Sequence, residues 1–301
     1  MKASGAGEPV QRFPNWRSLF LTGLVLWVAS VLVTGLTSNT NLIPTVVLLG
    51  SFLVPVTAVT WYLDHYRSEV LTVALVARAF VVGGILGLLA ASLLESWLLG
   101  DGVLVYVAVG LIEEGAKLLA LIWIARRLTR YSVRDGVVLG AAVGFGFAAL
   151  ESSGYAFNAL IVQEGGHFVG LSLPNLVYSE LLRGVLAPAG HGLWTAIAGG
   201  VLFGAAREGR LRVTGKVALT YVFVSLLHAL WDSMRGIALV LTALLTATPT
   251  QQISGTYGVL VPPTQHQMVT FLALDWGGLI VLTAIGVTVV LRIWRLGGQA
   301  R

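Results

Sequence analysis

The chain has 301 residues, of which 56% are hydrophobic and only 11% are charged, with 19 Lys and Arg against 14 Asp and Glu. Soluble domains carry about 25% charged residues, so this composition excludes a water-soluble globular protein. The absence of cysteine excludes disulfides, thiolate metal sites and a cysteine nucleophile.

Apolar stretches long enough to cross a membrane recur along the chain, since a spanning helix needs about 20 apolar residues. We predict an all-α, polytopic membrane helix bundle that forms a single transmembrane domain over residues 16–301 and follows a flexible cytoplasmic tail at 1–15. Its roughly eight transmembrane helices lie near residues 18–36, 43–62, 79–99, 103–125, 135–157, 176–206, 217–245 and 269–293. The sixth and seventh are too long for one straight crossing, so we expect each to include an interfacial segment or a break. Glycines four residues apart, such as Gly140 and Gly144, predict close helix packing.

Lys and Arg gather before the first predicted span and in every second connection, and this pattern gives the expected orientation. The connections at 126–134 and 207–216 are rich in basic residues, whereas those at 37–42, 100–102, 163–174 and 246–267 contain none. By the positive-inside rule, both termini are cytoplasmic. The long connection at 246–267 is then extracytoplasmic, as a lid or as a plain loop. Basic residues beside anionic lipid headgroups account for the net charge of +5, so we expect no nucleic-acid partner.

Ionisable residues lie inside four of the predicted spans. A charged residue at the bilayer centre costs about 2.5–3.5 kcal/mol, so such residues are candidates for function. The candidates are Glu113, Glu114, Lys117, Glu151, Tyr155, His191, His228 and Asp232. The helical rise places them near the midplane or in the outer half of the bilayer, so we expect one polar cluster.

Spacing within the fourth span orients three of these residues. Glu113 and Lys117 are four residues apart and share a helix face. Glu114 is rotated by about 100° from its neighbour. We therefore expect that Lys117 pairs with only one of the two carboxylates and leaves the other available for chemistry.

Residues 113–117 read EEGAK, which fits an EExxK motif, residues 147–155 fit FxxxExxxY, and residues 228–232 fit HxxxD. Together these motifs resemble those of PrsW-type intramembrane proteases. His191, with a threonine four residues later, stands where the family carries another histidine. The similarity covers about residues 79–245, which we take as the catalytic core. The family looks like a distant relative of the CAAX prenyl endopeptidases.

The resemblance implies an intramembrane endopeptidase that cuts a membrane-anchored protein near the extracytoplasmic half of the bilayer. In the best-known relatives this is a site-1-type cut in an anti-sigma factor. The resemblance also implies a multi-pass protein of a bacterial or archaeal plasma membrane. A proton- or ion-coupled transporter is the alternative, since buried Glu, His and Lys also form proton relays. A transporter predicts internal repeats, and the sequence shows none.

Two mechanisms fit the residues that the resemblance places in the site. Glu113 or Glu114 would act as general base in either. In the first, Zn²⁺ leaves one position open for water, and its ligands are His191, His228 and either Glu151 or Asp232. In the second there is no metal, and the histidines stabilise the oxyanion while a glutamate activates water. Charge balance favours the first, because four carboxylates face only Lys117.

Overall fold

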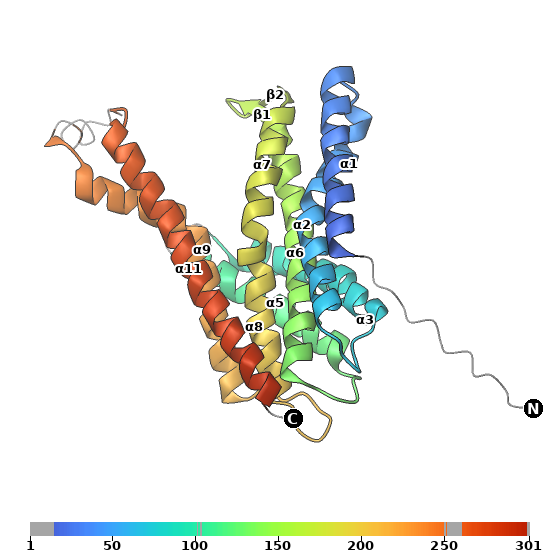
Figure 1. Ribbon diagram of the computed structural model, residues 1–301. Coiled ribbons are helices and arrows are strands. Elements are labelled where there is room, and N and C mark those ends of the chain that lie inside the picture. Colours follow the sequence, from blue (N-terminus) through green and yellow to red (C-terminus); the bar gives the residue numbers. More distant parts are fainter. Residues whose placement is uncertain (1–14, 101, 103, 250, 252–260, 300–301) are drawn as a thin grey trace, which may run out of the picture. The chain divides into compact units, whose positions relative to one another are not determined.

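The structure is a computed structural model that describes residues 15–299 apart from positions 101, 103, 250 and 252–260. The part of the chain it describes is almost entirely helical (Figure 1). The predicted tail at 1–15 lies outside the described residues except for Asn15, and so does part of the predicted loop at 246–267. The chain forms two compact units, which comprise residues 1–69 with 152–185 and residues 70–151 with 186–301.

The first unit is helical apart from one hairpin. Its elements are α1 (Trp16–Thr37), η1 (Thr40–Leu42), α2 (Ile43–His65), the end of α6, β1 (Ile161–Glu164), β2 (His167–Leu171) and α7 (Leu173–Leu186). Asn15 caps α1 by accepting a hydrogen bond from the Arg17 amide at 3.0 Å. Helix α1 packs on α2, and the apolar core of this unit consists of Trp27, Val46, Val47, Ala156, Leu160 and Leu176.

The antiparallel hairpin β1–β2 was not predicted from the sequence. Its turn consists of Gly165 and Gly166, which have φ values of 58° and 81°. Two residues with positive φ form one of the favoured hairpin turns, and glycine adopts this conformation without a steric penalty. The two adjacent glycines are the sequence signal for this turn within the predicted loop at 163–174.

A carboxyl group is buried inside the first unit, where Glu180 of α7 is 5% exposed. Its Oε2 accepts a hydrogen bond from the Trp27 indole Nε1 at 2.8 Å, while its Oε1 has no hydrogen-bond partner among the described residues. Gly50 of α2 makes the space for this group, because a Cβ there would collide with the Glu180 carboxylate. The carboxyl therefore lies directly against the backbone of α2.

The second unit contains the remaining helices. They are α3 (Val73–Arg78), a π-helical turn η2 (Ala79–Gly83), α4 (Gly84–Leu98), α5 (Val105–Ala125), most of α6 (Val133–Leu160), a 3₁₀ turn η3 (Ala187–Ala189), α8 (His191–Gly204), α9 (Gly215–Thr246) and α11 (Gln265–Gln299). Helix α5 packs against α4, α8 and α9, and α11 packs against α8 and α9. Helices far apart in the sequence thus meet around α5 and α8.

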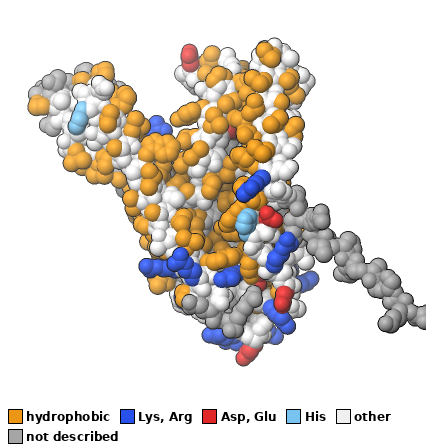
Figure 2. All heavy atoms as spheres, in the orientation of Figure 1, with side chains coloured by type: hydrophobic (Ala, Val, Ile, Leu, Met, Phe, Trp, Pro, Cys, Tyr) orange, Lys and Arg blue, Asp and Glu red, His pale blue; other side chains and the backbone are white. Residues whose placement is uncertain are grey.

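Seven described helical stretches are long and apolar enough to cross a membrane, and they confirm the predicted polytopic helix bundle. They are Trp16–Thr37, Thr40–His65, Val73–Leu98, Val133–Leu160, Leu173–Gly204, Gly215–Thr246 and Gln265–Gly298. Helix α5, the fourth predicted span, has 21 residues but is not among the seven, because it carries three charged residues in its middle. Hydrophobic side chains cover much of the visible helix surface (Figure 2).

The sixth predicted span is broken, as its length suggested. Helix α7 ends at Leu186, the short η3 turn containing Pro188 follows, and α8 begins at His191. Proline disfavours the helical conformation of the residue before it and lacks the N–H needed inside a helix. The seventh predicted span has no break, since α9 runs for 32 residues, and an interfacial segment stays the prediction for it.

Helices α6 and α8 approach each other backbone to backbone. Gly136, Gly140 and Gly144 lie one turn apart on α6, and a Cβ built on each would collide with a carbonyl oxygen of α8. The carbonyl groups they face belong, in the same order, to Gly199, Thr195 and His191. Only glycine at these α6 positions allows so close an approach. The contact therefore fixes the position of His191, the first residue of α8.

Candidate active site

Helix α5 supplies three charged side chains that are almost fully buried. The Lys117 Nζ lies 2.6 Å from Glu114 Oε1 and 3.3 Å from Glu113 Oε2. The prediction that Lys117 pairs with only one carboxylate is therefore wrong. Residues three and four positions before a lysine both lie on its side of the helix, and the long lysine chain reaches between them. The Lys117 side chain is 0% exposed, and its ammonium lies 4.1 Å from the centroid of the Phe147 ring.

His191 enters the site from the beginning of α8. Its Nδ1 lies 2.8 Å from Lys117 Nζ, and its Nε2 lies 3.0 Å from Glu151 Oε2. An ammonium only donates hydrogen bonds, so the His191 Nδ1 accepts and the ring proton is on Nε2, which donates to Glu151. Glu151 lies on α6. The two neighbours of the ring thus select one neutral tautomer.

His228 enters from α9 and is 1% exposed. Its Nδ1 lies 3.2 Å from Glu114 Oε1, and its Nε2 lies 3.1 Å from Asp232 Oδ2. The Trp194 ring of α8 stacks on the imidazole, with centroids 4.7 Å apart and an interplanar angle of 27°. Carboxylates at both ring nitrogens and an aromatic ring on one face hold His228 in a single orientation.

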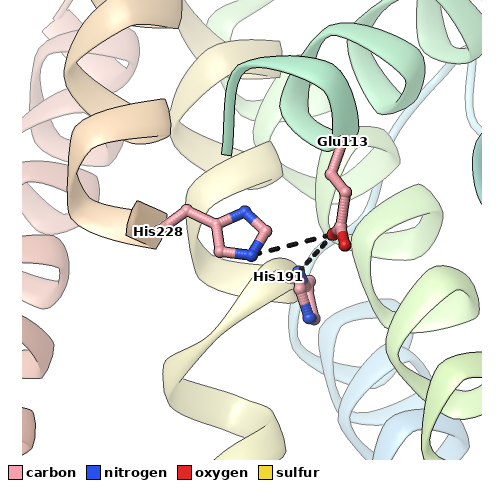
Figure 3. A group of neighbouring side chains, drawn as sticks. All are labelled: Glu113, His191 and His228. Carbon is pink, nitrogen blue, oxygen red and sulfur yellow. Dashed lines mark ion pairs between the residues drawn. The ribbon is translucent and has the colours of Figure 1, made fainter. Parts of the chain in front are cut away.

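Glu113, His191 and His228 form a group that could hold a metal ion (Figure 3). One ligand atom from each lies within 4.8 Å of the other two. The Glu113 Oε2 is 3.8 Å from His191 Nδ1 and 3.7 Å from His228 Nε2. Two imidazole nitrogens and one carboxylate are the donor set of many catalytic zinc sites, which keep a further position open.

The surroundings of the two histidines also fit a metal. A histidine that binds a metal usually donates its other ring N–H to a carboxylate, a carbonyl group or water. The nitrogens turned away from Glu113 contact Glu151 in the case of His191 and Glu114 in the case of His228. The residues present therefore fit a divalent cation. Glu151 and Asp232, which we predicted as ligands, lie beside the histidines and are not part of the three-residue group.

Seven of the eight predicted site residues lie together in the second unit; they are Glu113, Glu114, Lys117, Glu151, His191, His228 and Asp232. Tyr155 belongs to the first unit, where the guanidinium of Arg183 lies 4.2 Å from its ring centroid. The side chain of Asp232 is 30% exposed and that of Glu151 is 18% exposed, so the cluster is most accessible at these two carboxylates.

Trp194 is a site residue that the sequence did not point to. It is buried and contacts the rings of both His191 and His228. It follows His191 by three residues, and this spacing places both on one side of α8. A tryptophan in an apolar helix is usually a core residue, so nothing distinguished it. Thr195, which accompanies His191 in the motif, donates a hydrogen bond to Glu114 Oε2 at 3.4 Å.

Residues 68–254 match a protein-family model, that of the PrsW family intramembrane metalloprotease. The match covers more than half of the chain and encloses the predicted core at 79–245 as well as all eight predicted site residues. It does not favour a transporter. Comparison with curated proteins and with solved structures gave no match. The buried Glu and His cluster, the membrane-spanning helices and this match agree, and the chain belongs to the PrsW family of intramembrane metalloproteases.

Proposed function

We propose that this intramembrane peptidase holds Zn²⁺ with Glu113, His191 and His228 and hydrolyses a membrane-anchored protein in the extracytoplasmic half of the bilayer. The observation that carries the proposal is the convergence of three ligand atoms, from three different helices, within 4.8 Å. The His₂Glu donor set suits zinc. Zinc bound there would supply Lewis-acid chemistry that polarises a peptide carbonyl and activates water.

The other charged residues of the cluster orient the three proposed ligands and balance the charge around them. Glu151 and Glu114 accept hydrogen bonds from the far sides of the two imidazole rings. Lys117 supplies positive charge beside Glu113 and Glu114. Its ammonium also contacts His191 Nδ1, the nitrogen that faces Glu113. Metal binding would therefore replace that one contact, while Lys117 keeps its shorter ion pair with Glu114.

Depth along the helices supports a cut beyond the midplane. His191 begins α8, whose 14 residues extend for about 20 Å. His228 also lies about 20 Å from the start of α9 at Gly215. If the connection between α8 and α9 is cytoplasmic, both histidines lie past the middle of a hydrocarbon core about 30 Å thick.

The substrate class follows from the same placement. A site this deep acts on a segment that is itself in the bilayer, such as the span of a single-pass regulatory protein. An anti-sigma factor cut first on its extracytoplasmic side, in a bacterial or archaeal plasma membrane, fits this description. This assignment rests on the family resemblance.

Cleavage of a single-span reporter by the full chain in proteoliposomes tests the activity. We expect the Glu113→Gln, His191→Ala and His228→Ala variants to fall to background. Glu164→Gln and His167→Ala are matched controls, because both side chains are exposed on the hairpin. Wild-type turnover in the three site variants would contradict the assignment. Ion flux without cleavage in the same proteoliposomes would support a transporter instead.

Metal removal tests the choice between the two mechanisms. We expect about one zinc ion per purified chain, and loss of both zinc and cleavage after chelation, with recovery on adding zinc. The His228→Ala variant should lose the metal as well. A metal-free glutamate mechanism predicts full cleavage by metal-free protein in strong chelator, and that result would refute the zinc proposal.

A further inference from the structure

A basic pocket of about 520 Å³ lies in the second unit, where α8 ends and α9 begins. It is formed by the beginning of α6, the end of α8, the turn after α8, the start of α9 and the last part of α11. Its basic lining residues are Arg207, Arg212 and Lys216, and none of the described lining residues is acidic. The volume is in the range of small-ligand sites, about 300–1,000 Å³.

The charges of the pocket favour an anion. Arg212 is paired at 3.3 Å with Glu208, and both side chains are largely exposed, so this pair neutralises one of the three cations. Arg207 and Lys216 leave an excess of positive charge. Helix α9 begins at Gly215, between the lining residues Thr214 and Lys216, so its partly positive N-terminal end also opens on the pocket.

Another part of the pocket wall is apolar. Gly200 and Val201 of α8 and Ile293 and Leu296 of α11 line it. Leu296 is 64% exposed, on a helix that is apolar enough to span the membrane. A free inorganic anion would make no apolar contact with this wall, whereas the acyl chain of an amphiphile would cover it. Lys and Arg side chains gather toward the lower end of the view in Figure 2, where α11 ends.

We propose that this pocket binds the phosphate headgroup of an anionic membrane lipid, with the acyl chains lying along α11 beside Ile293 and Leu296. Phosphate is the shared chemistry of a lipid headgroup and of free phosphate, and the apolar wall selects the lipid. Basic pockets between spanning helices bind such headgroups. The lipid would join the ends of α8 and α9, the helices that carry His191 and His228. No metal ligand lines the pocket, so the proposal is independent of the peptidase chemistry.

Thermal unfolding of the full chain in detergent, with added lipid, tests the proposal. We expect phosphatidylglycerol to raise the Tm and phosphatidylcholine to leave it nearly unchanged, because a ligand that binds only the folded state stabilises it. Removing both cations, in Arg207→Gln with Lys216→Gln, should weaken binding about fivefold per cation. The matched control is Arg210→Gln, which removes the same charge from the same turn but does not line the pocket.

Further experiments distinguish a lipid headgroup from free phosphate and test the proposal even where a variant misfolds. Lys216→Arg should keep the phosphatidylglycerol shift, and inorganic phosphate alone should not reproduce it. Native mass spectrometry should count fewer retained phosphatidylglycerol molecules on Lys216→Gln than on Arg210→Gln, even if the double variant does not fold. Equal shifts with phosphatidylcholine, equal retention by these two variants, or a full shift with inorganic phosphate would overturn the assignment.

Discussion

Each histidine of the site has one ring nitrogen turned toward Glu113 and the other toward a separate carboxylate. This arrangement sets the orientation of both rings before any ligand arrives. For His191 the tautomer follows from two contacts, because Lys117 can only donate and Glu151 accepts. The glutamate on the far side of each ring is thus a positioning residue.

Glu151→Gln tests this positioning role. The glutamine oxygen can still accept from the His191 Nε2, but the negative charge that strengthens the ring as a ligand is lost. We expect zinc affinity to fall about 10- to 100-fold, measured by titrating zinc into metal-free full-length protein. Glu164→Gln on the exposed hairpin is the control. Unchanged zinc affinity together with lost cleavage would show that Glu151 acts on the substrate and not through His191.

Trp27→Phe tests the buried carboxyl of Glu180. This variant removes the hydrogen bond to Oε2, and Oε1 already has no hydrogen-bond partner among the described residues. A buried polar group without a partner costs about 1–3 kcal/mol, so we expect the free energy of unfolding to fall by that amount. Denaturation in detergent measures the change, and Trp97→Phe is the control because Trp97 is 72% exposed.

A second substitution separates the lost hydrogen bond from the lost tryptophan packing. Replacing both polar partners by apolar groups is often nearly neutral. Trp27→Phe combined with Glu180→Leu should therefore be more stable than Trp27→Phe alone. If the double variant is less stable than the single variant, the hydrogen bond is not what Trp27 contributes.

The sequence identified the charged residues of the site but not every role. Ionisable side chains stand out in apolar spans, and seven of the eight candidates do lie together. The grouping of Glu113 with the two histidines could not be predicted, because it depends on how α5, α8 and α9 are rotated about their axes. The spacing of residues along one helix gives no information about how that helix is rotated against its neighbours.

At the level of elements, the contact between α6 and α8 determines where His191 lies. The spacing of Gly140 and Gly144 predicted a close helix contact, and the structure identifies α8 as the partner. Glycine spacing shows that a helix can be approached closely but not by which helix. The break before α8 was easier to predict, since a span of this length cannot cross straight. Helix α9 is continuous, so of the two expectations for the seventh span only the interfacial segment remains.

Gly144→Ala tests the contact. The added Cβ would collide with the His191 carbonyl oxygen, so α8 must shift and His191 with it. We expect the free energy of unfolding to fall by about 1–3 kcal/mol, as for overpacking in a core. The cleavage rate should fall by a larger fraction than the free energy of unfolding does. Gly154→Ala is the control on the same helix, because a Cβ there meets no atom within 4 Å. Equal activity of the two variants would contradict the role of this contact.

For the whole molecule, the basic-residue pattern predicts which loops are cytoplasmic. Reporters fused after Arg130 and after Arg210 should report cytoplasm, because these connections carry the positive charge. Reporters at Asn39 and at Gly166 should report the outside, since both lie in connections without Lys or Arg. Protease protection in sealed vesicles gives an independent readout. The inverted pattern would place the catalytic cluster in the other half of the bilayer.

The division into two units was not visible in the sequence. Apolar length marks each spanning helix, but it does not say which helices pack together. The boundaries fall between residues 69 and 70, in the connection between α2 and α3, between residues 151 and 152, inside α6, and between residues 185 and 186, near the end of α7. The boundary inside α6 could not be predicted, because it lies within a continuous helix and not in a loop or linker, which are the signals that mark domains in a sequence.

The charges of helix α5 also affect when this helix enters the bilayer during synthesis. Its three central charges make it a poor substrate for insertion by itself, because each costs about 2.5–3.5 kcal/mol at the bilayer centre, less what the ion pairs within the helix recover. The partners that complete the pairing, His191 and His228, are synthesised later, the second more than a hundred residues after Glu113. At about 5–20 residues per second, that delay is on the order of ten seconds. During this interval we expect α5 to remain beside the translocon or a membrane chaperone, so the helix that carries most of the site's charge would be among the last to settle in the bilayer.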